Sequence, residues 1–229
     1  MPKNIIDKLA WFIPIKSLRN KFKINMKKHI INNYKYIKKT ANSEIVNKYL
    51  TGLKGIEIGG ASYADYGIDA INIDRVNILL DSNNAYYLEQ NKHSSFIQDI
   101  DIISNGDDLP FKDNTVDFVF TSHVLEHFFD PIKALKEWYR VTKKDGYIFM
   151  IIPHKERTFD KDRERTTLNE LIRRHDGTIK SKNQYDDMHH SVWITEDILE
   201  LCKYLNFNVV EYHDMDDCRK DGFIIVIQK

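Results

Sequence analysis

The sequence predicts an α/β fold, a doubly wound and mostly parallel sheet of seven strands whose last strand is antiparallel. Two observations predict it. From residue 41 onward, short apolar runs alternate with helical patterns, as in parallel sheets that are covered on both faces. The last two runs, Phe207–Tyr212 and Phe223–Gln228, are joined by a connection too short for a helical crossover. Such a connection favours an antiparallel pair at the end of the sheet.

Five apolar runs precede that pair. The first ends in two glycines, the second ends in an acid, and the fifth is stopped by Pro153, which cannot donate to a strand ladder. The expected strands are Gly55–Ile58, Ala70–Asp74, a strand within Phe96–Ile103, Thr115–Phe120 and Tyr147–Ile152.

Four segments before and between these runs have helical patterns. Asp130–Val141 carries apolar residues at helical spacing, and Thr195–Leu205 has Thr195 as its expected N-cap, followed by two acids in the first turn. The expected helices are Ser43–Leu50, Asp130–Val141, Leu168–His175 and Thr195–Leu205.

Charge divides the chain into two parts. Residues 1–40 hold eleven Lys and Arg but one acid, Asp7, whereas the other residues hold 23 basic and 33 acidic groups. We therefore expect a basic amphipathic helical arm over residues 1–42 and a globular domain over residues 43–229, with an insertion at about 153–194. The arm fits a membrane surface or a partner protein, and it fits equally a lid that packs on its own domain.

Composition excludes several classes of function. The acidic body argues against extended RNA or DNA binding. The two cysteines, Cys202 and Cys218, lack metal spacing and indicate no disulfide scaffold. No apolar run is long enough to span a bilayer and no signal-peptide pattern is present, so we expect a cytoplasmic protein, with peripheral attachment at the inner membrane face left open through the arm. The oligomeric state is not indicated.

A glycine loop and an acid suggest a nucleotide-like ligand. Gly59, Gly60 and Ala61 follow the first strand, where small residues let the backbone approach a ligand closely. Asp74, at the tip of the second strand, can accept hydrogen bonds from ribose hydroxyls. Nicotinamide and S-adenosylmethionine sites share both features.

Five sequence blocks in the middle of the chain distinguish an S-adenosylmethionine site from a nicotinamide site. The blocks are Leu109-Pro110-Phe111, Asp117-Phe118, Leu125-Glu126-His127, Arg140-Val141 and Asp145-Gly146. In this order they resemble the motif series of small-molecule class I S-adenosylmethionine-dependent methyltransferases, which are Rossmann-like, over roughly residues 53–155. Asp145-Gly146 replaces the usual Gly-Gly pair, and Ala61-Ser62 stands where further glycines are common. A nicotinamide oxidoreductase is disfavoured by this series and by the final strand pair.

The resemblance implies cofactor-binding roles for residues at the strand ends, with S-adenosylmethionine as cofactor and S-adenosylhomocysteine as product. For the methionine end it implies Glu57, Gly59, Gly60 and the adjoining Ala61, and for the ribose it implies Asp74. For the adenine side it implies Asn105, in place of the family's usual acid, with Asp107, Asp108 and Leu109. For the sulfonium pocket it implies Ser122 and His123. Glu126 and His127 fit either a hydrogen-bonded helix start or catalysis.

The insertion after Pro153 supplies the candidate acceptor site. It is similar to methyltransferases that accompany glycosyltransferases in bacterial capsule and O-antigen synthesis, and Trp11–Asn20 looks like a start shared by surface-glycan proteins. The resemblance implies an O-methyltransferase acting on a sugar, a sugar nucleotide, or a phosphate- or phosphoramidate-like decoration in capsular polysaccharide biosynthesis. Small-metabolite methylation outside glycan pathways and a non-catalytic cofactor-binding scaffold are the alternatives.

Histidines and arginines of the insertion are the candidate acceptor-site residues. A histidine suits the base that removes the acceptor's proton. We expect at least one of His190, His189 and His154 to act as this base or as a clamp on the acceptor, and the alternative for each is a hydrogen-bonding surface histidine. Arg157, Arg163 and Arg165 either clamp a phosphate or carboxylate of the acceptor or pair internally with Asp160, Asp162 and Glu164. Trp193 is a further candidate for acceptor binding. No recognisable spacing indicates a metal site, and whether the His and Asp residues of the insertion bind a metal is left open.

Two other methylation chemistries are disfavoured. The fourth strand ends in Thr121-Ser122-His123 rather than in the Asn/Asp-Pro-Pro-aromatic turn of enzymes that methylate amino groups of nucleic-acid bases. No Pro-Cys pair offers a nucleophile for methylation of a pyrimidine carbon.

Overall fold

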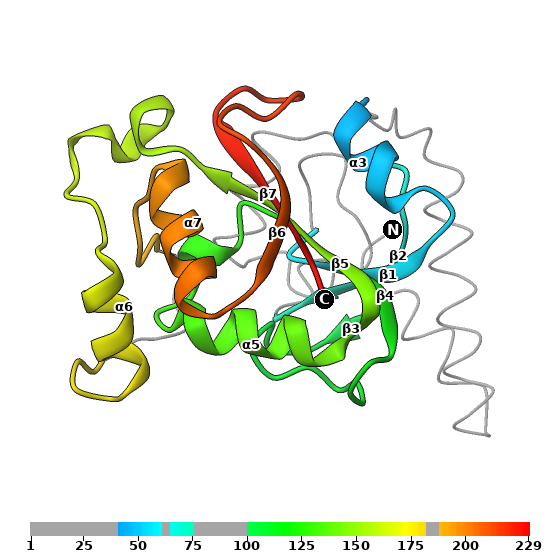
Figure 1. Cartoon of the computed structure of the whole chain (residues 1–229), viewed down its shortest axis with the longest axis horizontal. Helices are drawn as coiled ribbons and strands as arrows, with labels where there is room; N and C mark the ends of the chain where they lie inside the picture. The colour runs from blue at the N-terminus through cyan, green and yellow to red at the C-terminus, as the bar shows by residue number, and fades with distance from the viewer. Residues whose placement is uncertain (1–40, 61–64, 76–99, 182–187) are drawn as a thin grey trace, which may run out of the picture.

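A seven-stranded sheet forms the centre of the molecule (Figure 1). The computed structural model describes residues 41–60, 65–75, 100–181 and 188–229. The strands are β1 Lys54–Ile58, β2 Asp69–Asp74, β3 Ile102–Ile103, β4 Val116–Ser122, β5 Thr142–Pro153, β6 Asn208–His213 and β7 Gly222–Gln228. Their order is β3-β2-β1-β4-β5-β7-β6; the first five are parallel, and β7 is antiparallel to both neighbours. The predicted fold class is confirmed.

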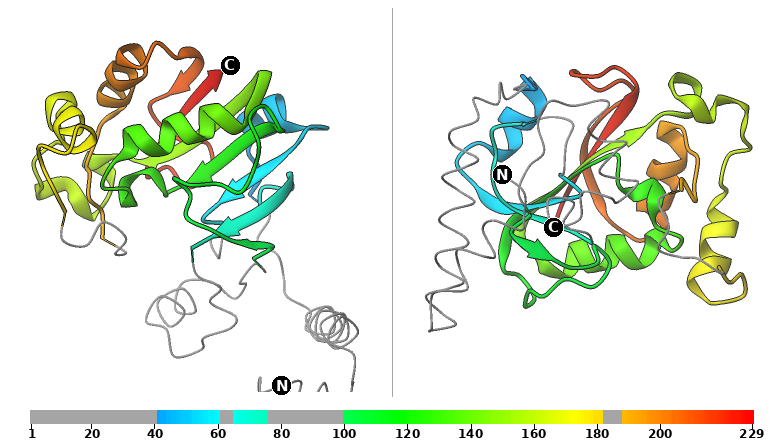
Figure 2. Two further views of the ribbon diagram at one scale, coloured as in Figure 1. Left: turned by 90° about the horizontal axis from the view of Figure 1, so that it is seen from below. Right: turned by 180° about the vertical axis from the view of Figure 1, so that it is seen from behind.

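Helices cover both faces of the sheet, as expected for a doubly wound fold. The α-helices are α3 Glu44–Leu50, α5 Pro131–Val141, α6 Leu168–His175 and α7 Thr195–Tyr204. Short 3₁₀ helices follow β4 and β5, namely η1 Leu125–His127, η2 Lys155–Arg157 and η3 Phe159–Asp162. Figure 2 shows α5 lying along one face of the sheet.

The capping prediction for α7 is wrong by one residue. Ile194 is the N-cap, and the Asp197 carboxylate accepts a hydrogen bond from the backbone N–H of Ile194 at 2.9 Å. Thr195 is the first helical residue, and its hydroxyl donates to the Asp214 carboxylate at 2.6 Å. Asp197 takes over the capping role because an acid in the third helical position can reach back to the N-cap N–H.

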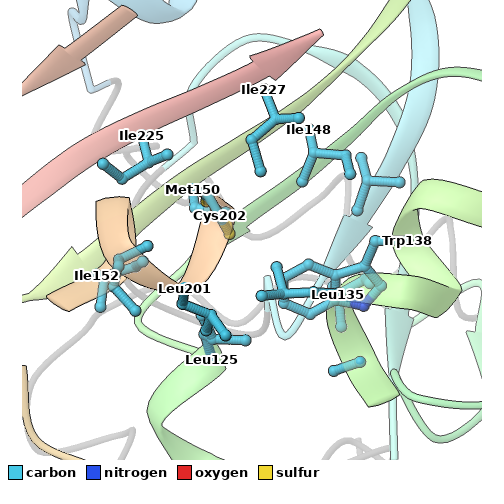
Figure 3. Close-up of a cluster of buried hydrophobic side chains, with 14 of the residues drawn as sticks. Leu125, Leu135, Trp138, Ile148, Met150, Ile152, Leu201, Cys202, Ile225 and Ile227 are labelled. Atoms are coloured by element: carbon cyan, nitrogen blue, oxygen red, sulfur yellow. The ribbon is translucent and has the colours of Figure 1, made fainter. Parts of the chain in front are cut away.

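Alternating strand residues build two cores, one on each face. Figure 3 shows the larger core, where α5 and α7 contribute Trp138 and Leu201 against Met150 and Ile225 of the sheet. The opposite face is aromatic and packs against Val46 and Leu50 of α3; its strand residues include Phe118, Phe120 and Phe149. This two-sided burial is why the strands read as continuous apolar runs.

The insertion lies at the carboxyl end of β5, next to α7 (Figure 1). Its two ends are tied together where the N–H of Lys155 donates to the carbonyl of Trp193 at 2.9 Å. It also reaches the segment after β4, because the N–H of His190 donates to the carbonyl of Glu126 at 2.8 Å. The insertion therefore packs over the strand ends where open α/β sheets bind ligands.

The predicted arm, residues 1–42, lies almost wholly outside the described residues, so the domain boundary stays a prediction. Ser43 accepts a hydrogen bond from the N–H of Val46 at 3.0 Å and begins the described domain as the N-cap of α3. Within the described ranges, the helices are too short or too polar to cross a membrane.

Candidate cofactor and acceptor site

Strand register brings the predicted cofactor residues to one edge of the sheet. Ile58 of β1 is paired with Ile73 of β2 and with Thr121 of β4. The next residue of each strand or loop therefore lies in one row: Gly59, Asp74 and Ser122. Parallel strands make this inevitable, since their carboxyl ends meet at the same edge.

Gly59 and Gly60 form a narrow backbone turn at the centre of that row. Gly59 has a φ of +72°, and a Cβ there would lie 2.6 Å from the Cγ2 of Val124. A Cβ on Gly60 would lie 2.4 Å from the Cδ of Glu57, whose side chain is buried. Only glycine fits at both positions without displacement, because the side chains of Val124 and Glu57 pack directly against the turn. Ala61, also predicted to bind cofactor, lies outside the described residues.

The loop after β3 is anchored to α5. The indole N–H of Trp138 donates to the carbonyl of Gly106 at 2.8 Å, and the Glu137 carboxylate accepts from the N–H of Leu109 at 2.7 Å. Lys133 donates to Asp107 at 3.0 Å. These bonds fix the backbone between the predicted adenine-side residues, Asn105 and Asp108 among them. The side chains of Asp107 and Leu109 are themselves buried.

Gly106 is a residue of this loop that the sequence interpretation missed. A Cβ on Gly106 would lie 2.8 Å from the Cγ2 of Ile58 and 2.9 Å from the Cζ of Phe128. Its lack of a side chain lets the loop reach the end of β1. A single glycine between polar residues gave no sign of this contact.

β4 ends at Ser122, and the next residue, His123, has an unusual backbone conformation. His123 has a φ of +55°, a left-handed value that is uncommon outside glycine and is often found at functional sites. Its ring Nε2 lies 3.4 Å from a carboxylate oxygen of Asp221. Burial would raise the pKa of Asp221, but His123 and Arg219 outweigh burial and hold that pKa below its usual range.

The three predicted catalytic histidines occupy different environments. His154 is mostly buried, its Nδ1 accepts from the N–H of Glu156 at 3.2 Å, and its Nε2 lies 3.6 Å from Asp214. Burial, followed by the charge of Arg157, lowers the pKa of His154. The ring of His190 packs edge-on against Phe129, at 5.8 Å between centroids. Neither His154 nor His190 belongs to the cluster that His189 forms with Glu126 and His127.

His189 is held by a buried carboxylate. Its Nδ1 lies 2.6 Å from Asp160, and Asp160 in turn accepts from Arg163 at 2.7 Å. Burial is the main reason that the pKa of His189 is lowered, although the bond to Asp160 acts in the opposite direction. The ring of Phe159, exposed at 78%, lies 4.8 Å from the His189 ring between centroids.

Glu126 and His127, in η1, face His189. The Nε2 of His189 lies 3.9 Å from the Oε1 of Glu126, and the Nε2 of His127 lies 3.7 Å from the same oxygen. The Glu126 side chain is fully buried, and burial raises its pKa to about 8. Within the described structure no other residue donates a hydrogen bond to either carboxylate oxygen. Whether Glu126 and His127 form a hydrogen-bonded helix start or act in catalysis stays a prediction.

Internal ion pairs engage all three arginines of the insertion. Arg157 pairs with Asp214 at 3.1 Å, Arg163 pairs with Asp160, and Arg165 pairs with Asp197. Two of these partners differ from the acids expected from the sequence, because Asp197 and Asp214 come from segments beyond the insertion. A clamping role for the arginines stays a prediction.

The assignment of Trp193 to acceptor binding is corrected. Its side chain is 1% exposed and belongs to the core beneath the sheet ends. An indole that is already surrounded by apolar side chains has no surface left for an acceptor, so Trp193 supports the insertion by packing.

Comparisons with known proteins agree with this geometry. A family model described as a methyltransferase domain matches residues 59–150. The chain is 29% identical over 107 residues to a chloroplastic 2-methyl-6-phytyl-1,4-hydroquinone methyltransferase of Oryza sativa. The matched region covers 46% of this chain and 32% of that relative. It is 58% identical over 40 residues to an uncharacterized methyltransferase of Schizosaccharomyces pombe, over 18% of the chain and 14% of that relative. The chain thus spans a third or less of the length of these relatives.

A solved structure shows the same fold. An S-adenosylmethionine-dependent methyltransferase of Methanosarcina mazei superposes with a TM-score of 0.50 at 17% identity, over 81% of this chain and 97% of that one. The domain match confirms the predictions of a methyltransferase domain and of S-adenosylmethionine as its cofactor. The acceptor, the catalytic residues and any partner stay predictions.

Proposed function

We propose that this chain is an S-adenosylmethionine-dependent O-methyltransferase whose acceptor is a sugar, a sugar nucleotide or a phosphate-like decoration of a surface polysaccharide. The observation that carries the methyltransferase part is the row formed by Gly59, Asp74 and Ser122 inside the matched methyltransferase domain. The acceptor part is supported by the chemistry of the insertion.

The cofactor residues fit S-adenosylmethionine. The turn at Gly59 and Gly60 follows β1 and has no side chain of its own, so its backbone suits a close approach by the methionine end. Asp74 lies one strand away and is suited to accept hydrogen bonds from its ribose hydroxyls. When bound, the cofactor supplies an electrophilic methyl group on a sulfonium. The chain then has to orient the acceptor oxygen and assist the loss of its proton.

The face formed by Phe159, His189 and His127 fits a hydroxyl-bearing acceptor. The exposed Phe159 ring offers a flat apolar surface against which the C–H face of a sugar ring can pack. The histidines beside it supply polar atoms that can orient a hydroxyl. Apolar platforms flanked by a few directed polar groups are typical of small-molecule sites.

A groove next to this face is polar. It has a volume of about 550 Å³ and is connected to His189 through Arg163, whose guanidinium donates to the His189 carbonyl at 2.8 Å. Its lining mixes three basic residues with five acids, namely Lys155, Arg163, Arg165, Glu156, Asp162, Glu164, Asp197 and Glu200. Such a polar lining favours a hydroxyl-rich acceptor over a long hydrocarbon chain, and its excess of acids does not favour a phosphate.

The test is release of S-adenosylhomocysteine when the pure protein meets S-adenosylmethionine and separate pools of sugar phosphates, sugar nucleotides and capsule oligosaccharides. Release that is stimulated by one pool, with a methylated product of matching mass, is the expected result. Stimulation by none of them, while a hydroquinone is methylated, would overturn the glycan acceptor and favour a small metabolite, the chemistry in the name of the rice relative.

A calorimetric titration with S-adenosylhomocysteine separates the enzyme from a non-catalytic scaffold. A scaffold would bind S-adenosylhomocysteine and release none in any assay. An enzyme would bind it and also form product. Absence of binding would overturn the cofactor assignment itself.

A further inference from the structure

Three side chains from two distant segments converge beside the candidate acceptor face. Glu126 and His127 belong to η1, and His189 belongs to the insertion. One ligand atom of each, a carboxylate oxygen and two imidazole nitrogens, lies within 4.8 Å of the other two. The backbone bond from the N–H of His190 to the carbonyl of Glu126 holds the two segments together.

Glu126 needs a partner that the described protein does not provide. The side chain is 0% exposed, and neither carboxylate oxygen accepts a hydrogen bond from another described residue. Burying a carboxylate without a donor or a cation is costly. A cation at the centre of the three side chains would satisfy it.

His189 is oriented as a ligand. A carboxylate oxygen of Asp160 lies 2.6 Å from the Nδ1 of His189, so Nδ1–H is the donor of this hydrogen bond. The lone pair of Nε2 is then directed toward Glu126. Asp160 is itself held by Arg163. A carboxylate behind a histidine is the usual outer-shell arrangement of histidine-ligated metals.

We propose that Glu126, His127 and His189 bind a divalent transition-metal ion, with Zn²⁺ the first candidate. Two imidazoles and a carboxylate are a ligand set of catalytic zinc, which keeps its fourth position open. Mg²⁺ and Ca²⁺ fit less well because they take mostly oxygen ligands. The sequence did not predict this site, because its third ligand, His189, is far along the chain from Glu126 and His127.

Zinc binding requires the three ligand side chains to move slightly closer together. Ligand bonds of about 2.0–2.2 Å place the ligand atoms of one zinc ion about 3.4 Å apart. The distances of 3.7 and 3.9 Å from Glu126 are close to this value. His127, whose side chain is 35% exposed, can rotate to close the remaining gap and leaves the open position on the outer side.

Binding of the ion does not depend on the proposed function, but its role does. If the acceptor lies against this face, the open position is where its hydroxyl or phosphate oxygen would coordinate. A coordinated ion lowers the pKa of a bound hydroxyl and so assists loss of its proton.

The experiment measures metal binding to the full chain, freed of any affinity tag and stripped with chelator. Zn²⁺ is titrated in competition with a chromophoric chelator, and Co²⁺ is titrated while its visible absorption is followed. We expect one tight equivalent of Zn²⁺ and the absorption bands of a low-coordinate Co²⁺ site with nitrogen ligands. Zinc-edge absorption spectroscopy should detect imidazole scattering.

Variants locate the ion. Glu126→Gln keeps the shape of the side chain. Glu126→Gln and His189→Ala, as separate variants, should each weaken Zn²⁺ binding more than tenfold, since each removes a ligand. His175→Ala is the matched control, because His175 lies on α6 and pairs with Asp130 at 2.9 Å, away from the cluster. Far-UV circular dichroism in metal-free buffer verifies that each variant folds.

Two results would overturn the site: wild type that binds Zn²⁺ no more tightly than Glu126→Gln, or equal weakening by His175→Ala. The first would mean that Glu126 is buried as the neutral acid. Failure of the proposed function is distinguishable, because it would appear as lost S-adenosylhomocysteine binding or absent methyl transfer while the zinc equivalent remains.

Discussion

Asp160 lies 2.6 Å from the Nδ1 of His189, although the two residues come from opposite ends of the insertion. This pair orders the insertion around one imidazole and directs its second nitrogen toward the segment after β4. The carboxylate of Asp160 is buried, so the interaction is shielded from solvent and geometrically fixed.

Asp160→Asn should lower methyl transfer while leaving cofactor affinity unchanged. Loss of an outer-shell carboxylate typically costs about 10- to 100-fold in metal affinity or activity, because the imidazole loses its fixed orientation. Initial rates and S-adenosylhomocysteine titrations measure the two effects separately. Lys161→Gln, an exposed change in the same short helix η3, is the control. Equal losses in both variants would show that the whole helix, rather than the pair, matters.

Asp74→Ala should weaken binding of S-adenosylhomocysteine. If Asp74 holds the ribose, the variant loses hydrogen bonds to a charged acceptor, each worth about 1.5–3 kcal/mol, or more than tenfold in dissociation constant. Calorimetric titration measures this loss. Asp69→Ala, at the opposite end of β2, is the matched control. Unchanged affinity in Asp74→Ala would remove the ribose assignment.

The fold could be predicted because its determinants are local. Apolar runs, the glycines after β1 and the short connection before β7 each specify an element or its direction within a few residues. The cofactor row follows from the same information, since strand ends in a parallel sheet must meet.

The acceptor side could not be predicted to the same degree because tertiary contacts decide it. Nothing near Trp193 in the sequence shows that its indole is buried, and nothing near Arg165 shows that its partner is Asp197 in α7. The group of Glu126, His127 and His189 arises only when the insertion folds back onto η1. Residues 1–40 and Ala61 lie outside the described ranges, so expectations about them are unchanged.

Glu211 should stabilise the fold in a pH-dependent way. Hydrogen bonds from Lys48, then Tyr49 and His213, lower the pKa of Glu211 from 4.5 to about 2. A lowered pKa means that the stabilisation is fully present above about pH 4.5 and is lost as the pH falls toward 2. The stability gap between wild type and Glu211→Gln should therefore narrow between pH 5 and pH 3.

Urea unfolding of both proteins across this pH range measures the gap. Other acids titrate in both proteins alike, so their contribution cancels in the difference between the two free energies of unfolding. Because Lys48 is largely exposed, the gap should also shrink in high salt. A gap that is constant from pH 7 to pH 3 would show that Glu211 has no charge-dependent role.

Gly59→Ala should damage both stability and cofactor binding, whereas Gly177→Ala should damage stability alone. Both glycines have left-handed φ values, +72° and +81°, and forcing alanine into that region costs about 1–2 kcal/mol. A Cβ on Gly59 would also meet Val124 at 2.6 Å, whereas a Cβ on Gly177 would meet nothing within 4 Å. Because Gly59 lies in the row with Asp74, displacement of its turn should weaken S-adenosylhomocysteine binding at least tenfold. Equal affinity in the two variants, measured well below their unfolding midpoints, would show that the turn after β1 does not contact the cofactor.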